Sequence, residues 1–179
     1  MNNHHIIDYF KIPTSNSRLD NYTFWLIIKY FIKSVYILIV NIRFLGRPSE
    51  DNFAFLESTY NQIFHENLTC YHKYFYYFYG KRLLHIYRYK GIKAGFGLFR
   101  INPIWTIHMC KFGIVSNLQG RGLAKTFLSE SLDYWKREGF KRVSVYIDHK
   151  NYIARKTYES VGFETVDFLK TQILMEKKL

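Results

Sequence analysis

Cysteine is scarce in this 179-residue chain, where only Cys70 and Cys110 are present. Disulfide frameworks and zinc sites need several cysteines at short, paired spacings, and these two residues have no such spacing. The sequence therefore indicates neither kind of site. We expect a reduced, cytoplasmic protein that needs no metal.

Acidic residues are also few, because 14 Asp and Glu stand against 26 Lys and Arg, giving a formal net charge of +12. A surface of this sign attracts anions such as nucleotides, phosphorylated cofactors, acidic carriers, nucleic acid or anionic lipid. The excess is not gathered into a basic tail, which weakens the prediction of a dedicated nucleic-acid-binding protein. Charge alone does not choose among the remaining partners.

A long uninterrupted apolar run is missing as well. The nearest candidate, Phe24–Val40, contains Lys29 and Lys33 and is shorter than the ~20 residues that a spanning helix usually needs. Packing on a core is the favoured interpretation, ahead of lying on a membrane surface or spanning it. The first twenty residues are polar or mixed, so no signal peptide is expected.

What is present is enough apolar residue, 48% of the chain, for one packed core. We expect an N-terminal extension over residues 1–33, packed on a single domain over residues 34–179. Asn21–Lys33 in the extension is typical of a helix, and Leu38–Phe44 near the start of the domain alternates as a half-buried strand does.

Ser49 stands where a helix N-cap would, followed by acidic residues that suit the first turn of a helix running to about His65. The stretch Tyr71–Tyr79 is almost wholly aromatic and no single period assigns it. Such runs are usually core or the wall of a groove, which we favour over a base-stacking surface.

The rest of the chain alternates strands and helices. Leu83–Tyr89 and Ala94–Ile101 predict a hairpin that turns at Lys90 and Gly91. The elements expected after it are a strand at Trp105–Val115, a helix from Gly122 to a stop at Gly139, a strand at Arg142–Asp148, a helix at Asn151–Val161 closed by Gly162, and final strand material from Phe163 to Glu176. This order, β, α, β, α, β after the hairpin, predicts a mixed α/β (α+β) domain.

The junction Val115–Ala124 leads from a strand through a glycine-containing loop directly into a helix. Glycine lets the backbone approach a ligand closely, and the first-turn amides of a helix have no partner inside the helix. Arg121 and Lys125 add positive charge at the same end. The junction therefore predicts an anion site, although glycine turns before helices also occur without a ligand.

A second motif follows at Asn151–Phe163, in which Asn151, Ala154 and Tyr158 fall on nearly one helical face. Together the two motifs resemble those of the GCN5-related N-acetyltransferase (GNAT) superfamily. Its signature is Gln/Arg-x-x-Gly-x-Gly/Ala on a strand-to-helix turn and then Asn-x-x-Ala-x-x-x-Tyr-x-x-x-Gly-Phe. The matching residues are Gln119, Gly122 and Ala124 in the first motif and Asn151, Ala154, Tyr158, Gly162 and Phe163 in the second.

The resemblance extends from about Leu83 to Leu179 and implies a GNAT-like fold, a splayed, mixed and mainly antiparallel sheet flanked by helices. It also implies that acetyl-CoA, or another acyl-CoA, is the co-substrate, with its pantetheine arm along Cys110–Val115 and Tyr158 facing the thioester sulfur as an acid for the leaving thiolate. The residues that the resemblance assigns to the cofactor are Ile114, Val115, Gln119, Gly120, Arg121, Gly122, Leu123, Ala124, Lys125 and Asn151.

The base is less defined, because family members commonly use a carboxylate or an ordered water near the strand before the loop, and Trp105–Val115 contains no Asp or Glu. His108 is the residue there whose pKa suits base catalysis at neutral pH, with Cys110 a weaker candidate on the same face. Deprotonation through water is an equal alternative.

These features predict an N-acyltransferase that acts on a primary amine of a small molecule, such as an amino sugar or amino acid derivative, by direct attack in a ternary complex. Two alternatives remain open. One is acylation of a macromolecule, either aminoacyl-tRNA or protein, with nucleic acid or an acyl carrier protein docked on the basic surface. The other is a noncatalytic acyl-CoA-binding or peripheral membrane protein. A homodimer is also left open.

Overall fold

The computed structural model describes residues 25–32, 34–35, 44–102 and 105–179. The chain divides into two units, Met1–Tyr36 and Ile37–Leu179. In the first unit residues 25–32 are helical, as the pattern of Asn21–Lys33 predicts. The strand predicted over Leu38–Phe44 lies outside the described residues except for Phe44, which is in a helical position. No described helix is long and apolar enough to cross a membrane.

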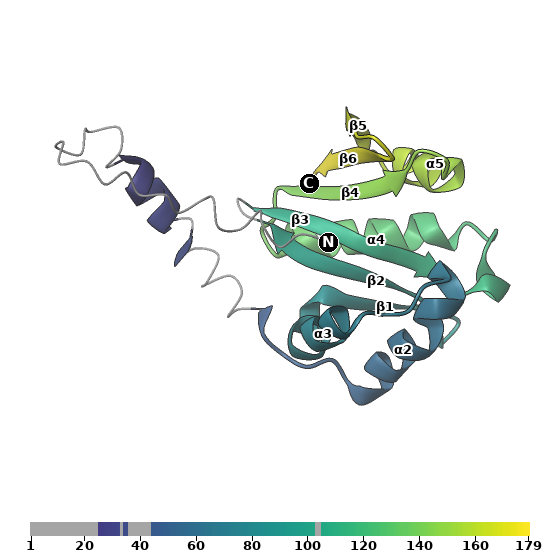
Figure 1. Cartoon of the computed structure of the whole chain (residues 1–179). Coiled ribbons are helices and arrows are strands. Elements are labelled where there is room, and N and C mark those ends of the chain that lie inside the picture. The colour runs from purple at the N-terminus through teal and green to yellow at the C-terminus, as the bar shows by residue number, and fades with distance from the viewer. Residues whose placement is uncertain (1–24, 33, 36–43, 103–104) are drawn as a thin grey trace. The chain divides into compact units, whose positions relative to one another are not determined.

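The second unit is built on one sheet of six strands in the order β1-β2-β3-β4-β6-β5 (Figure 1). Only β3 and β4 pair in parallel, and every other neighbouring pair is antiparallel. The strands are β1 (Leu84–Tyr89), β2 (Ile92–Asn102), β3 (Thr106–Ile114), β4 (Arg142–Asp148), β5 (Glu164–Phe168) and β6 (Gln172–Lys178).

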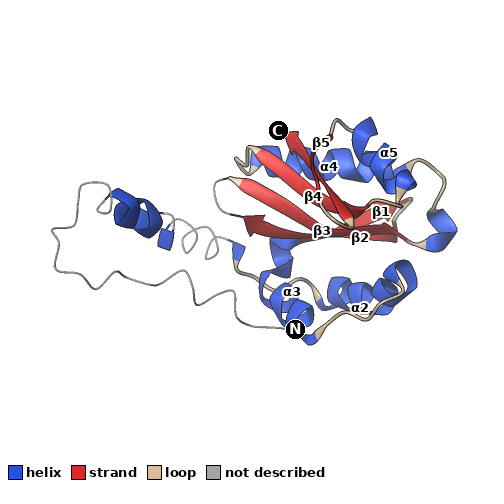
Figure 2. Cartoon of the chain, turned by 45° about the horizontal axis from the view of Figure 1, so that its top comes forward, coloured by secondary structure: helices blue, strands red, loops and turns tan. Residues whose placement is uncertain are grey.

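Helices cover both faces of this sheet. In Figure 2, α2 and α3 lie on one side, and α4 and α5, which contact each other, lie on the other. Their bounds are Glu50–Phe64 for α2, Cys70–Leu83 for α3, Leu123–Arg137 for α4 and Tyr152–Ser160 for α5. The predicted splayed, mixed and mainly antiparallel sheet flanked by helices is confirmed.

Aromatic rings fill the layers on both faces. Tyr60 of α2 stacks on Phe96 of β2 with ring centroids 6.0 Å apart. On the opposite face, Tyr87 of β1 stacks on Phe127 of α4 at 4.8 Å. Buried aromatic pairs of this kind contribute beyond the area that they bury, so both helical layers are fixed against the sheet.

The aromatic run that no period assigned forms most of α3. Thr69 caps this helix by accepting a hydrogen bond from the His72 amide. Tyr76 is buried, whereas Tyr71 and Tyr74 are exposed. Because rings occur all round the helix, the periodic contrast that reveals an amphipathic helix is weak.

The turns explain where the strands end. The hairpin between β1 and β2 turns at Lys90 and Gly91, whose φ angles are 50° and 81°, as a two-residue type I′ turn requires. At the C-terminus, the strand material predicted from Phe163 to Glu176 forms two strands, β5 and β6, where the predicted order β, α, β, α, β counts one. Leu169 donates its amide to the Gln172 carbonyl, which closes a turn and makes two antiparallel strands.

The parallel pair at the centre of the sheet separates part of the way along. Residues of β3 and β4 are paired only from Thr106 opposite Arg142 to Met109 opposite Val145. Beyond that point β3 continues to Ile114 and β4 to Asp148 without pairing to each other. Cys110 begins the separated part of β3 and is also a bulge, because Met109 and Lys111 pair with consecutive residues of β2.

Candidate active site

Two cavities meet where β3 and β4 separate. The loop-side cavity, about 570 Å³, is lined by the loop after β3 and the start of α4. The helix-side cavity, about 520 Å³, is lined by α2, α3 and the sheet. Both are lined by Phe64, Phe112, Asn151, Ala154 and Tyr158. The separation of the strands thus joins two recesses across the sheet.

The loop between η2 (Ser116–Leu118), a short 3-10 helix, and α4 presents backbone donors to the loop-side cavity. Gly120 and Gly122 have φ angles of 74° and 75°, and no atom lies within 4 Å of a Cβ placed on either residue. The first helical hydrogen bond here is from the Lys125 amide to the Gly122 carbonyl. The amides of Leu123 and Ala124 come before it, which leaves donors at the positive end of α4 for an anion.

The side chains predicted to add charge at this end are both exposed. Arg121 donates to the Asn117 carbonyl over 3.4 Å, and Lys125 lies in the first turn of α4. Neither is held in an ion pair among the described residues. Both remain available to a phosphate.

The end of β3 offers one free backbone edge to the opening. Val115 donates its amide to the Ala94 carbonyl of β2 over 2.9 Å. Because backbone groups alternate in direction along an antiparallel strand, those of Ile114 point the other way, into the opening. Gln119 donates its side-chain amide to the Ile114 carbonyl over 2.8 Å, which braces the loop on the end of β3.

Asn151 lies at the other wall of the opening. Its Oδ1 accepts a hydrogen bond from the Ala154 amide over 3.0 Å and so caps α5. Asn151 lines both cavities while it caps the helix.

Tyr158 of α5 stands at the junction of the two cavities. Its residue is 6% exposed and its hydroxyl donates to the Met109 sulfur over 3.4 Å. Burial raises the pKa of Tyr158, so the phenol keeps its proton at neutral pH. It can therefore act as an acid or as a hydrogen-bond donor.

His108 lies on the helix-side wall with its ring against Tyr146, at 5.2 Å between centroids. Its Nδ1 shares a hydrogen bond of 3.0 Å with Ser144 Oγ. Burial, with a smaller contribution from Arg100, lowers the pKa of His108 to about 4. The ring is therefore neutral at pH 7, the state in which it can accept a proton.

Cys110 lines the same cavity as His108, as strand alternation predicts. Burial raises the pKa of its thiol. It is therefore a thiol at neutral pH, and a poorer proton acceptor than His108.

Sequence reasoning missed a polar cluster behind this wall. Glu66, in the connection between α2 and α3, accepts hydrogen bonds from Tyr60 at 2.9 Å and from Lys111 at 2.5 Å. The bond to Lys111 lowers the pKa of Glu66, so this carboxylate stays ionised and is a weak base. Its two partners lie in α2 and β3, and Lys111 is 45 residues away in the sequence, so no local pattern joins the cluster.

A family model decides how these features are interpreted. The model described as the acetyltransferase (GNAT) family matches residues 50–163. The chain belongs to this family. Acetyl-CoA, or another acyl-CoA, is accordingly the co-substrate of this GNAT protein. The match begins at α2, well before Leu83, where the resemblance in sequence becomes recognisable.

Solved GNAT structures share the fold at low sequence identity. Naa50 of Arabidopsis thaliana, in complex with the bisubstrate analogue CoA-Ac-MVNAL, is 16% identical, with 75% of this chain and 97% of that chain covered at a TM-score of 0.63. The NatC complex bound to Gag peptide and CoA is 19% identical, with 73% of this chain and 92% of that chain covered at a TM-score of 0.62. The PaiA N-acetyltransferase of Thermoplasma acidophilum, in complex with coenzyme A, is 15% identical, with 75% of this chain and 98% of that chain covered at a TM-score of 0.57. No curated protein sequence matches the chain.

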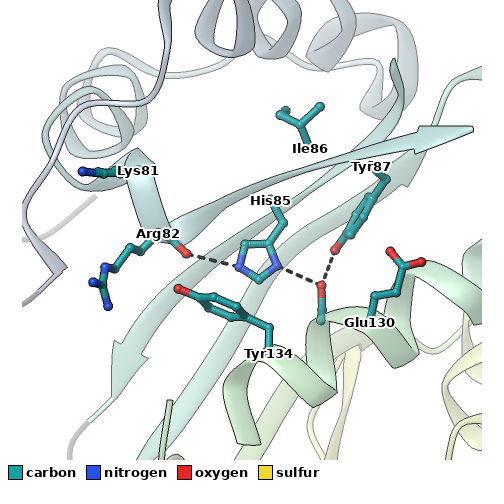
Figure 3. Close-up of a pocket in the computed structure, with 8 residues that line it drawn as sticks. Lys81, Arg82, His85, Ile86, Tyr87, Glu130 and Tyr134 are labelled. Atoms are coloured by element: carbon teal, nitrogen blue, oxygen red, sulfur yellow. Dashed lines mark hydrogen bonds between the residues drawn. The ribbon is translucent and has the colours of Figure 1, made fainter. Parts of the chain in front are cut away.

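A separate cavity of this GNAT domain, about 250 Å³, lies between β1 and α4 and is lined by His85, Tyr87, Glu130 and Ser131 among others (Figure 3). A carbonyl can only accept, so the 3.2 Å contact with the Arg82 carbonyl requires that His85 Nε2 carries the proton. His85 Nδ1 then accepts from Ser131 over 2.9 Å, and Ser131 Oγ accepts from Tyr87 over 2.6 Å. His85, Ser131 and Tyr87 are thus all hydrogen-bonded to one another or to the backbone. We interpret them as a structural link between β1 and α4 rather than as reactive groups.

Groups that could hold a metal are not found in the part of the chain that the structure describes, where no three His, Cys, Asp or Glu residues come together.

Proposed function

We propose that this GNAT protein transfers an acetyl or other acyl group from acyl-CoA to a primary amine of a small molecule, by direct attack in a ternary complex. The observation that carries the proposal is the meeting of the loop-side and helix-side cavities at Tyr158, where β3 and β4 separate. A donor entering from one side and an acceptor from the other would meet at this residue.

The loop-side cavity suits the donor. The amides of residues 120–124, with Arg121 and Lys125 beside them, fit a pyrophosphate at the positive end of α4. The outward edge of Ile114 and the side chain of Asn151 fit the amide groups of a pantetheine arm. Gln119 acts in this proposal by holding the loop against Ile114.

The helix-side cavity suits the acceptor. A protonated amine gives a proton to His108, directly or through water, and its lone pair then attacks the thioester carbonyl. The carbon–sulfur bond breaks as the new carbon–nitrogen bond is completed, and the nitrogen loses its second proton, which replaces the one that Tyr158 gives up. Tyr158 donates a hydrogen bond or its proton to the departing CoA thiolate. Neutral His108 and protonated Tyr158 have the states that these two steps require.

The experiment is an acceptor screen that records CoA release with amino sugars, amino acids, polyamines, peptides and aminoacyl-tRNA. We expect release with a small amine, together with acetyl-CoA binding by calorimetry. Binding without release from any acceptor would support the noncatalytic acyl-CoA-binding protein instead. Absence of binding would reject the donor site as well.

A macromolecular acceptor is the second candidate, favoured by the formal charge of +12. Two of the similar structures also hold peptide-containing ligands, the analogue CoA-Ac-MVNAL and the Gag peptide. Acceptor binding that weakens steeply as salt rises would support an acidic macromolecule, because such binding releases counterions. Weak salt dependence would favour the small amine.

A further inference from the structure

Arg100 lies on the acceptor side of the site, beside His108 on the neighbouring strand. The two residues are paired in the register of β2 and β3, so both side chains stand on the face that carries α2 and α3. Arg100 lines the helix-side cavity and also an adjoining cavity of about 340 Å³, whose wall includes Tyr71, His72 and Phe75. It therefore stands at the boundary between the base and an aromatic recess.

The other charged groups of the helix-side cavity have partners. Lys111 pairs with Glu66 at 2.5 Å, and Asp148 Oδ1 accepts a hydrogen bond from the Lys150 amide at 2.7 Å. No carboxylate of the described ranges forms an ion pair with Arg100. Among the residues that the structure describes, Arg100 is thus an exposed cation without an ion-pair partner.

The two histidines of this cavity, His72 and His108, are neutral at pH 7. Desolvation is the main cause of the lowered pKa of His72, and Lys111 and Arg100 act in the same direction. His108 is also neutral at pH 7, with its pKa lowered to about 4 by burial and by Arg100. The cavity thus contains one permanent, unpaired cation next to two neutral imidazoles.

Arg100, although exposed, adds to burial in making His108 a weak base. A cation beside His108 makes the ring a weaker base, and weaker bases take protons from amines less readily. An anion on the guanidinium would remove that effect. The planar guanidinium offers paired donors that match a carboxylate or a phosphate.

We propose that the acceptor amine carries an anionic group, a carboxylate or a phosphate, and that Arg100 binds this group. The inference rests on the proposed function, because it defines the acceptor of the same site. It selects amino acids and phosphorylated amino sugars over neutral amines. Binding of the anion also couples acceptor recognition to the basicity of His108.

The test uses pairs of acceptors that differ only in the anion. Phenylalanine is compared with phenylalaninamide, and glucosamine 6-phosphate with glucosamine, in CoA-release assays of the full chain. Binding of all four compounds is also measured by calorimetry in the presence of CoA, which needs no turnover. We expect the anionic member of at least one pair to have a kcat/KM and an affinity higher by about tenfold or more. The preferred pair identifies carboxylate or phosphate.

Variants assign the effect to Arg100. Arg100→Gln should remove most of the preference for the anion, and Arg100→Lys should restore part of it, since lysine keeps the charge without the paired donors. Arg137→Gln, at the exposed end of α4, is the control for loss of one positive charge and should keep the preference. In Arg100→Gln the pKa of His108, followed by NMR, should also rise.

The outcomes separate the two proposals. Neutral members that bind as tightly as anionic ones, or an anion preference that survives in Arg100→Gln, would overturn the inference while leaving acyl transfer intact. Anion preference in binding without CoA release from any acceptor would support the inference as a binding site and count against the proposed function.

Discussion

The hydroxyl of Tyr158 lies 3.4 Å from the sulfur of Met109, and Met109 belongs to the last residue pair that joins β3 to β4. A thioether is a weak acceptor, so the hydrogen bond orients the phenol but is weaker than one to oxygen or to a thiolate. Burial raises the pKa of Tyr158 and keeps its hydroxyl protonated, so a better acceptor could replace the sulfur.

Tyr158→Phe should lower kcat by about 10- to 100-fold with little change in acetyl-CoA affinity, because the phenol acts mainly on the transition state. The ring would keep its contact with Phe163, at 5.3 Å between centroids, so the melting temperature should change little. Steady-state kinetics and calorimetry check both parts. Turnover at the wild-type level would remove Tyr158 as the acid.

Gly122→Trp should abolish acetyl-CoA binding, a loss of about 100-fold or more in affinity, because the indole would occupy the space in front of the α4 amides. Gly139→Trp is a matched control at the other end of α4. Both glycines have φ angles in the left-handed region, 75° and 88°, and neither has an atom within 4 Å of an added Cβ.

Both variants therefore carry similar backbone strain, of order 1 kcal/mol, and should lose similar stability in urea unfolding. Only Gly122→Trp should lose the ligand in calorimetry. Equal acetyl-CoA affinity in the two variants would show that the pyrophosphate is not bound at this loop.

His108→Gln should lower kcat/KM by about 100-fold if the ring is the base. The pH dependence that comes from ionisation of the acceptor is the same for both enzymes, so it cancels in the ratio of wild-type to variant kcat/KM. Since His108 acts when neutral and its pKa is about 4, this ratio should be constant from neutral pH down to about pH 5 and then fall. A ratio near one throughout would favour deprotonation by water.

The backbone geometry of the loop-side cavity could be predicted because its determinants are local. Gly120 and Gly122 adopt positive φ angles within one strand-to-helix turn, and Asn151 caps the helix that it begins. Each of these roles depends on spacing within a single segment. His108 was proposed for its pKa in a strand without Asp or Glu, and alternation along β3 placed Cys110 on the same face.

The wall of the helix-side cavity depends on contacts between elements that are far apart in the sequence. Arg100 meets His108 only through the pairing of β2 with β3, and Lys111 meets Glu66 across 45 residues of sequence. The aromatic residues of α3 occur all round the helix, so the sequence shows no helical period there. Local rules identify a helix start or a strand face, whereas a pocket wall is assembled from several elements after they pack.

Stability at mildly acidic pH provides a test of the link between β1 and α4. His85 packs between the rings of Tyr134 and Trp135, at 4.8 and 5.2 Å between centroids, and burial lowers its pKa to about 4 from 6.5. Protonation of Nδ1 would also break the bond that Ser131 donates.

The unfolded chain takes up this proton near pH 6.5, before the folded protein does, so the folded state loses stability as pH falls from about 6.5 to about 4. The loss from His85 is at most roughly 3 kcal/mol, and His108 adds to it in the same direction. Urea unfolding at pH 7, 6, 5 and 4.5 measures the decline.

His85→Gln is the variant that isolates the titration. A glutamine amide can donate to the Arg82 carbonyl and its oxygen can accept from Ser131, so both bonds have a replacement that does not ionise. We expect some loss of stability at pH 7 from poorer stacking, and a shallower decline toward pH 4.5 than in the wild type. Parallel declines would mean that His85 titrates normally and that the closed chain from Tyr87 through Ser131 does not hold the ring neutral.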